Sequence, residues 1–204
     1  VKCENLQKVG AFKYRGASNA VMQLNLEQAS AGVVTHSSGN HAQALALAAR
    51  QRSIPAWIVM PSNAPQIKQD AVADYGATIV LCEPTLEARE TTAAEIVAQQ
   101  QATFIHPYNN AHVMAGQATV GAEILEQVTQ LDAIVAPVGG GGLLAGIALA
   151  AKALQPSIRV YGAEPTGADD AWRSKQAGEL IPQTGPATIA DGLLTSLGDL
   201  TWPV

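Results

Sequence analysis

The sequence predicts an α/β protein whose strands form parallel sheets. Short apolar segments alternate with helical segments along nearly the whole chain. The apolar segments lack a regular exchange of polar and apolar residues, which is typical of strands covered by helices on both faces. Unusual loops follow Thr35, Val138 and Ala163, and loops beyond the carboxyl ends of parallel strands are where ligands bind in such sheets.

The amino-terminal half supplies the first strand–helix units. The helix that starts at Lys13 places Ala17 and Val21 on one face. Pro61 ends a strand, and Gly76 suits the position just after a helix. The expected elements are a strand over 1–5, helices over 13–24 and 25–31, a strand over 32–35, a helix over 42–50, a strand over 56–60, a helix over 66–75, a strand over 77–82 and a helix over 86–101.

The carboxyl-terminal half repeats the pattern. We expect a strand over 103–106, a loop over 107–111, a helix over 114–130, a strand over 133–138, a glycine run over 139–142, a helix that ends near residue 154 and a strand over 158–163. The region 32–110 carries strand–helix units of its own. We therefore expect a small domain over 32–110, inserted into a large domain made of residues 1–31 and 111–204.

Composition limits the functional classes. Of the 204 residues, 48% are hydrophobic and 14% are charged, so the chain can bury a core. The net charge of −5 and the lack of a basic run argue against nucleic-acid binding, and no apolar run is long enough to span a membrane. Cys3 and Cys82 are too few for a disulfide framework, which favours a reducing, cytoplasmic setting. The Val1 start and the abrupt end after Val204 indicate a piece of a longer chain, incomplete at both ends.

One lysine stands in a segment of small residues, 10–17. The small neighbours of Lys13 allow a flat ligand to approach the backbone closely. Phe12 shields the amine from water and Arg15 adds a second positive charge, and both effects lower the pKa of a lysine. An amine of lowered pKa is the form that attacks carbonyl groups. The alternative is an ordinary solvated lysine at a helix start.

A polar loop over 37–41 follows the strand over 32–35. Ser38 offers a hydroxyl that can donate or accept a proton, and Asn40 offers an amide to an acceptor oxygen. Packing is the alternative role for His41, and helix capping is the alternative for the serines. The loop therefore supplies polar groups suited to a small polar ligand.

Four glycines, Gly139–Gly142, join a strand to a helix. Their backbone N–H groups and the positive end of the helix form a cradle for a phosphate group. A rival interpretation uses the same residues, because Gly140, Gly142 and Ala145 fit the relaxed dinucleotide fingerprint and Glu164 stands where a ribose-binding acid is expected. The hypothesis that the protein is an NAD-dependent dehydrogenase therefore stays open.

The segments 10–17, 37–43 and 139–146 resemble those of the fold-type II pyridoxal-phosphate enzymes, in the same order. The nearest subgroup is serine racemase with the serine/threonine and 3-hydroxyaspartate dehydratases. The resemblance implies the tryptophan synthase β-like fold, with two open, twisted, mostly parallel sheets flanked by helices. It also implies β-elimination (deamination) or racemisation of small hydroxy-amino acids such as L-serine, L-threonine or 3-hydroxyaspartate, with pyridoxal 5′-phosphate bound as an aldimine of Lys13.

The resemblance carries roles to individual residues. Lys13 would hold the cofactor and act as base on one face of the substrate, and Ser38 would face the other side of the α-carbon. The cofactor contacts would be Phe12, Lys13, Asn40, Gly139, Gly140, Gly141, Gly142 and Leu143. The substrate contacts would be Ser37, Ser38, Gly39, His41 and Gln43.

A metal ion, a nucleotide and a homodimer are further implications of the resemblance. Glu164, the carbonyl of Ala168 and Asp170 would form a hard oxygen site that suits Mg²⁺ or Ca²⁺. The alternative for these residues is a polar turn that caps the next helix. Three positions match contacts to an allosteric ATP in the mammalian-type racemase, namely Lys8, Gln43 and Tyr75.

Three hypotheses of function follow. The first is a pyridoxal-phosphate ammonia-lyase or amino-acid racemase, and the second is an NAD-dependent dehydrogenase. The third is a truncated relative that keeps the fold without the chemistry. The sequence does not rank serine, threonine and 3-hydroxyaspartate as substrates.

Overall fold

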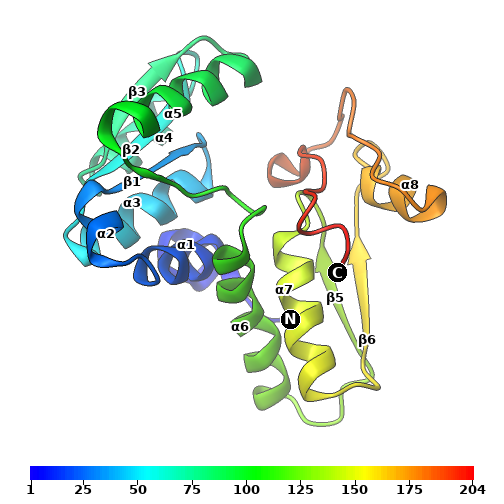
Figure 1. The fold of residues 1–204 in the computed structure, drawn as a ribbon. Coiled ribbons are helices and arrows are strands. Elements are labelled where there is room, and N and C mark those ends of the chain that lie inside the picture. The colour runs from blue at the N-terminus through cyan, green and yellow to red at the C-terminus, as the bar shows by residue number, and fades with distance from the viewer. The chain divides into compact units, whose positions relative to one another are not determined.

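The computed structural model describes residues 1–204 and has the expected α/β fold with parallel sheets. The chain forms two compact units, Val1–Pro107 (unit 1) and Tyr108–Val204 (unit 2). Figure 1 shows the elements of each unit along the chain, from blue to red. The expected small domain over 32–110 within a large domain of 1–31 and 111–204 stays a prediction.

Unit 1 is built on a four-stranded parallel sheet with the strand order β3-β2-β1-β4. Its strands are β1 (Val33–His36), β2 (Ala56–Pro61), β3 (Thr78–Cys82) and β4 (Thr103–Phe104). Its α-helices are α1 (Lys13–Met22), α2 (Leu26–Ala31), α3 (Asn40–Arg52), α4 (Gln66–Ala73) and α5 (Leu86–Gln100).

Helices cover both faces of this sheet. Val34 and Val59 pack against Ala93 and Ile96 of α5. Ile58 is also fully buried, although its side chain points to the opposite face because strand side chains alternate. Burial on both faces explains why the strand sequences show no polar alternation.

Unit 2 pairs two helices with a small parallel sheet. Its elements are α6 (Ala111–Gln127), β5 (Ala133–Pro137), α7 (Gly142–Leu154), β6 (Arg159–Ala163) and α8 (Asp170–Ala177). The helices α6 and α7 pack closely at Gly146, where an added Cβ would lie 2.5 Å from the carbonyl oxygen of Met114. A larger residue at position 146 would therefore force the two helices apart.

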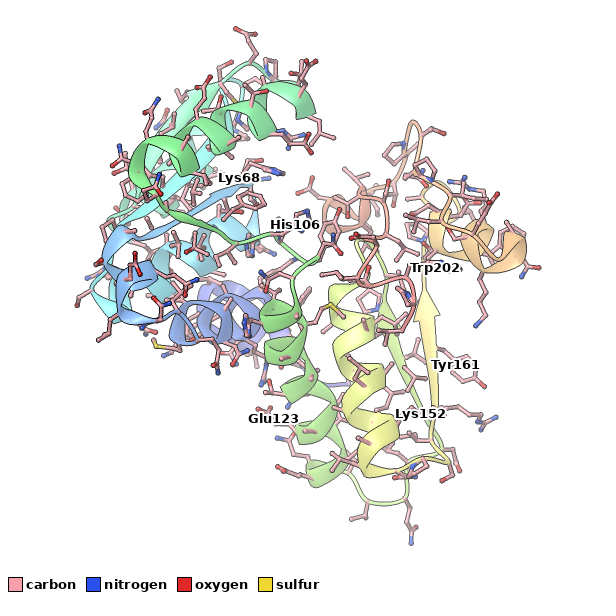
Figure 2. The ribbon with its side chains drawn as sticks, in the orientation of Figure 1. Lys68, His106, Glu123, Lys152, Tyr161 and Trp202 are labelled. Carbon is pink, nitrogen blue, oxygen red and sulfur yellow. The ribbon has the colours of Figure 1, made fainter.

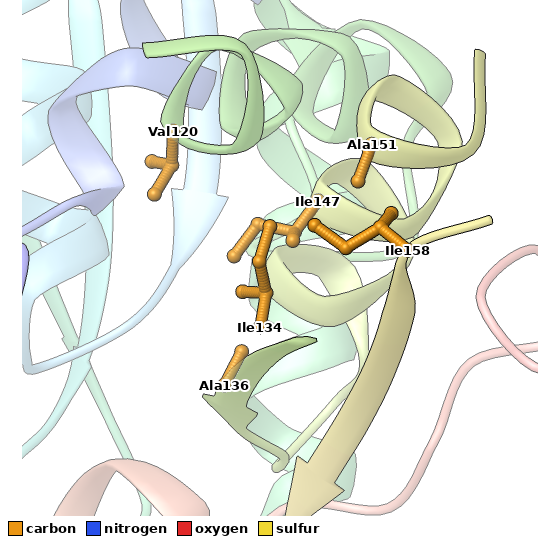
Figure 3. Packing of buried hydrophobic residues seen from close by; sticks show 6 residues of the cluster. All are labelled: Val120, Ile134, Ala136, Ile147, Ala151 and Ile158. Atoms are coloured by element: carbon orange, nitrogen blue, oxygen red, sulfur yellow. The ribbon is translucent and has the colours of Figure 1, made fainter. Parts of the chain in front are cut away.

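The core of unit 2 lies between these helices and one face of the sheet. Figure 3 shows six of its members: Val120, Ile134, Ala136, Ile147, Ala151 and Ile158. On the other face of the sheet, Val135 and Tyr161 are exposed, and Figure 2 shows Tyr161 projecting from β6 away from α7. None of the helices combines the length and the apolar character that crossing a membrane requires.

One expected strand and the expected start of one helix were wrong. Residues 1–5 form no strand, because Glu4–Leu6 makes a 3₁₀ turn and the Glu4 carboxylate binds Arg15 of α1 at 2.7 Å. The helix expected over 114–130 begins three residues earlier, since the side chain of Asn110 accepts hydrogen bonds from the N–H groups of His112 and Val113 and so caps α6.

Candidate active site

Lys13 is the first residue of α1, and the residue is half-buried. Its Nζ donates a hydrogen bond to the carbonyl oxygen of Pro107 at 2.8 Å and lies 5.4 Å from the centre of the Phe12 ring. Burial lowers the pKa of Lys13 from 10.5 to about 8, because removal from water disfavours the charged amine. The expected contribution from Arg15 was wrong, since that guanidinium pairs with Glu4.

His41, the last residue of the expected polar loop, is the second residue of α3 and is almost fully buried. Its Nε2 lies 3.1 Å from the carbonyl oxygen of Ile105, which fixes Nε2 as the protonated nitrogen. Burial, reinforced by the charge of Lys13, lowers the pKa of His41 to about 3. The ring is therefore neutral at working pH, and its buried Nδ1 has no hydrogen-bond partner. An unmet acceptor of this kind fits a site that receives a polar ligand.

The loop between β1 and α3 leaves the start of α3 without a side-chain cap. The N-cap residue is Gly39, and its own N–H donates to the hydroxyl of Ser37 at 3.3 Å. The expected alternative, in which a serine caps the helix, is therefore wrong. Asn40 is exposed as the first residue of α3. The uncapped N–H groups at the start of α3 fit a carboxylate, because the helix end is positive.

The glycine turn in unit 2 joins β5 to α7 and also lacks a side-chain cap. Gly141 is the N-cap residue with φ of 86°, a conformation that other residues adopt only with strain. A Cβ on Gly140 would lie 2.3 Å from Cγ of Tyr108, so the aromatic ring occupies the space of a side chain. The turn is thus the uncapped, positive start of a helix, and it has room only for glycine. These properties suit the binding of a phosphate group.

Two residues that support this turn were missed by sequence reasoning. Thr201 is buried, and its hydroxyl donates to the carbonyl oxygen of Gly140 at 2.8 Å. The same hydroxyl accepts the N–H of Gly198 at 2.9 Å. Tyr108 packs against Gly140 and Gly142. Neither residue belongs to a motif, and their distance from the glycines in the sequence gave no signal.

The carboxylates expected to bind a metal ion serve first as hydrogen-bond acceptors. The two oxygens of Glu164 accept the N–H groups of Ala171 and Trp172 at 3.0 and 2.8 Å, and so cap α8. Asp170 is buried and accepts the N–H of Leu197 at 2.9 Å. Burial raises the pKa of both carboxylates, and the charge of Asp170 adds to the rise at Glu164.

The capping alternative therefore describes what Glu164 does in the structure. No three side chains of His, Cys, Asp or Glu come together in a geometry that would hold a metal. The donor set of Glu164, Asp170 and the buried Ala168, whose carbonyl is the third donor, still has the hard chemistry of a Mg²⁺ or Ca²⁺ site, since each oxygen accepts more than one bond. The cation stays a prediction.

The three positions expected to contact ATP all lie in unit 1. Tyr75 lines a cavity of about 360 Å³ together with Arg50 and Ser53. Lys8 and Gln43 do not line this cavity, and the Lys8 amine lies 5.0 Å from the centre of the Tyr14 ring. The structure therefore does not gather the three residues around that cavity.

The expected site residues are divided between the two units. Unit 1 holds the lysine and the residues of the polar loop, and unit 2 holds the glycine turn with Leu143 and the carboxylates. Within its own unit, each set of residues has contacts that suit the binding of a ligand. The bridging of Lys13 and the glycine turn by one cofactor molecule stays a prediction.

A buried amine, an uncapped polar loop and a glycine cradle are the parts that a phosphorylated aldehyde needs. The whole chain, residues 1–204, matches the family described as "Pyridoxal-phosphate dependent enzyme". The chain belongs to this family of pyridoxal-phosphate-dependent enzymes, and its fold is that of the fold-type II members.

Individual relatives narrow the comparison. The chain is 56% identical to serine racemase of Arabidopsis thaliana over 203 residues, which is 100% of this chain and 61% of the relative. It is 54% identical to the beta-hydroxyaspartate dehydratase of Paracoccus denitrificans, over 98% of this chain and 64% of the relative. The solved structure of maize serine racemase superposes with a TM-score of 0.97 at 54% identity, over 99% of this chain and 61% of that chain.

The chain thus spans about three-fifths of the length of these relatives. The matches do not favour the NAD-dependent dehydrogenase. The capping role of Glu164 agrees with this, because both of its oxygens already accept backbone N–H groups.

Proposed function

We propose that the protein eliminates the β-hydroxyl of small hydroxy-amino acids, interconverts their enantiomers, or does both, with pyridoxal 5′-phosphate as cofactor. The observation that carries this is the buried Lys13 amine with its pKa lowered to about 8, in a chain that belongs to a pyridoxal-phosphate family. Similarity to serine racemases and to a beta-hydroxyaspartate dehydratase supports L-serine and 3-hydroxyaspartate as substrates, and similarity to a solved threonine deaminase of Solanum lycopersicum supports L-threonine.

The cofactor, when bound, draws electrons from the α-carbon and so makes the α-proton removable. Lys13 would hold the cofactor, and its amine in the neutral form would accept the α-proton, a role that its lowered pKa supports. Asn40 would bind the ring of the cofactor, and the glycine turn with the N–H of Leu143 would hold its phosphate. Phe12 keeps water away from the amine, which preserves its low pKa.

The polar loop orients the amino acid. The uncapped start of α3, with Ser37, Gly39 and Gln43 around it, binds the α-carboxylate. Neutral His41 offers its unpaired Nδ1 to a donor on the substrate. Ser38 gives or takes a proton on the face opposite Lys13. Return of a proton from the Ser38 side yields the mirror-image amino acid, whereas loss of the β-hydroxyl leads to a keto acid and ammonia.

The test separates the two faces in the full-length protein. The assays measure keto acid and D-isomer from L-serine, L-threonine and 3-hydroxyaspartate, with wild type and the Ser38→Ala variant. We expect the substitution to reduce racemisation on the order of 100-fold, the value of a positioned proton donor, while elimination from the L-isomer changes only a few-fold. Equal losses in both reactions would contradict the two-face mechanism. Ser62→Ala, at an exposed position, serves as the matched control.

Further parts of the proposal rest on resemblance and donor chemistry. Glu164, the Ala168 carbonyl and Asp170 would hold Mg²⁺ or Ca²⁺, and the charge of a bound cation would oppose the effect of burial, which raises the pKa of both carboxylates. ATP as an effector, a homodimer and a cytoplasmic location are proposed on the same basis. Repeating the assays with and without Mg²⁺ and ATP, at known oligomeric state, tests the cation, the effector and the dimer, and imaging of the tagged full-length protein in cells tests the location.

A further inference from the structure

An ion pair ties the segment before α1 to the helix itself. The guanidinium of Arg15 donates to both oxygens of the Glu4 carboxylate, from Nε at 2.7 Å and from a terminal nitrogen at 2.9 Å. The Arg15 and Glu4 side chains are 11% and 17% exposed, so water competes little for these bonds. Charge-assisted bonds in this paired geometry are strong and directional. The pair therefore closes a loop over 4–15, and Lys13 lies inside that loop.

Within this loop the backbone is left-handed at two consecutive residues. Val9 has a φ of 59° and a ψ of 15°, and Gly10 has a φ of 67°. Glycine adopts this conformation freely, whereas a β-branched residue adopts it only with strain. The N–H of Gly10 donates to the carbonyl oxygen of Gln7 at 2.8 Å and closes the turn around Val9. A strained backbone of this kind persists only where the surrounding structure holds it.

The left-handed turn determines where α1 begins. Phe12, the N-cap residue of α1, makes no side-chain cap, so the helix start depends on neighbouring segments for its position. Relaxation of Val9 to a negative φ would redirect the chain just before Lys13, whose amine now lies 2.8 Å from the carbonyl oxygen of Pro107. The ion pair opposes this movement, because one partner precedes the turn and the other belongs to α1.

We propose that Glu4 and Val9 are positioning residues for Lys13. The ion pair holds the strained turn, and the pair and the turn together fix the start of α1 so that the amine points to where the cofactor is attached. This inference rests on the proposed function, because it names the residues that support Lys13 in the role given to it there. Neither residue touches the reacting atoms, since both act through the backbone and Arg15.

The experiment compares four forms of the full-length enzyme with its cofactor: wild type, Glu4→Gln, Val9→Gly and the double variant. Glu4→Gln should lower kcat for elimination from L-serine about 10- to 100-fold, because a misplaced amine reacts slowly. KM should change less than about threefold, because the substrate is bound by other groups. Adding Val9→Gly should raise kcat again about fivefold or more, because glycine keeps the left-handed turn without the ion pair.

Two further variants make the comparison specific. Val9→Ile keeps the β-branched side chain, so we expect it to give no recovery when it is combined with Glu4→Gln. Glu95→Gln, at an exposed position in α5, is the matched control for the loss of a carboxylate. If Glu4→Gln does not fold, Glu4→Asp takes its place, with a smaller loss that Val9→Gly again reverses. Recovery with Val9→Ile, or none with Val9→Gly, would overturn the inference.

Cofactor attachment separates this inference from the proposed function. When pyridoxal phosphate is added to the cofactor-free full-length forms, its visible absorbance on Lys13 should develop slowly in Glu4→Gln and faster in the double variant. These two forms carry the same charge, so the recovery reports the position of the amine. This order in a protein that acts on no hydroxy-amino acid would refute the proposed function and leave the inference standing. An active enzyme in which Glu4→Gln slows neither attachment nor turnover would refute the inference alone.

Discussion

The two units approach ligand binding in different ways. Unit 1 relies on side chains whose chemistry is set by burial, as the lowered pKa values of Lys13 and His41 show. Unit 2 relies on backbone, because its glycine turn offers N–H groups and excludes any side chain larger than hydrogen at Gly140. The chemistry of the side chains in unit 1 therefore depends on how well they are shielded from water. Binding in unit 2 depends on the shape of the glycine turn.

The largest effect that tests this contrast is expected from Lys13→Ala in the full-length protein. Removal of the amine should abolish the visible absorbance of attached pyridoxal phosphate and reduce turnover by about 10⁴-fold or more, because Lys13 is the amine that would hold the cofactor and accept the proton. Absorption spectra and keto acid assays measure both quantities. Lys152→Ala, at an exposed position labelled in Figure 2, is the control. If the Lys13→Ala variant kept both the absorbance and the turnover, the claim that unit 1 acts through the side chain of Lys13 would be wrong.

A smaller effect is expected from Gly140→Ala in unit 2. The added Cβ would overlap the ring of Tyr108, at 2.3 Å from Cγ, so we expect unfolding to become easier by about 1–3 kcal/mol. Displacement of the turn should also weaken the binding of pyridoxal phosphate about 10- to 100-fold. Denaturant unfolding and cofactor titration measure the two changes.

Gly192→Ala is the matched control for that substitution, since a Cβ at this position meets nothing within 4 Å. We expect it to leave both stability and cofactor affinity close to the wild-type values. A folded Gly140→Ala variant that binds the cofactor as tightly as wild type does would show that the turn is not a shape-limited cradle.

The smallest effect is a pH dependence of about tenfold per unit in the attachment of the cofactor to Lys13. Only the neutral amine attacks an aldehyde, and the pKa of Lys13 is lowered from 10.5 to about 8. The attachment rate of cofactor-free protein should therefore rise with pH up to about 8 and level off above it. Stopped-flow absorbance records the rate. A rise that continues to pH 10 would mean that Lys13 is solvated like an ordinary lysine.

Much of the fold and the motifs could be predicted because they are local. The strand–helix alternation and the glycine turn depend on neighbouring residues, and both were confirmed in the structure. The cause of the low pKa of Lys13 was only half predicted, because the pairing of Arg15 with Glu4 depends on tertiary contact.

The hydroxyl of Thr201 has a consequence for the interpretation of natural variants. It reaches Gly140 across 61 positions of sequence, so the anion cradle is tethered to a segment that a motif search ignores. Loss of that hydroxyl would leave the carbonyl oxygen of Gly140 without its side-chain hydrogen-bond donor. A substitution at position 201 can thus impair cofactor retention while every recognisable signature of the enzyme stays intact.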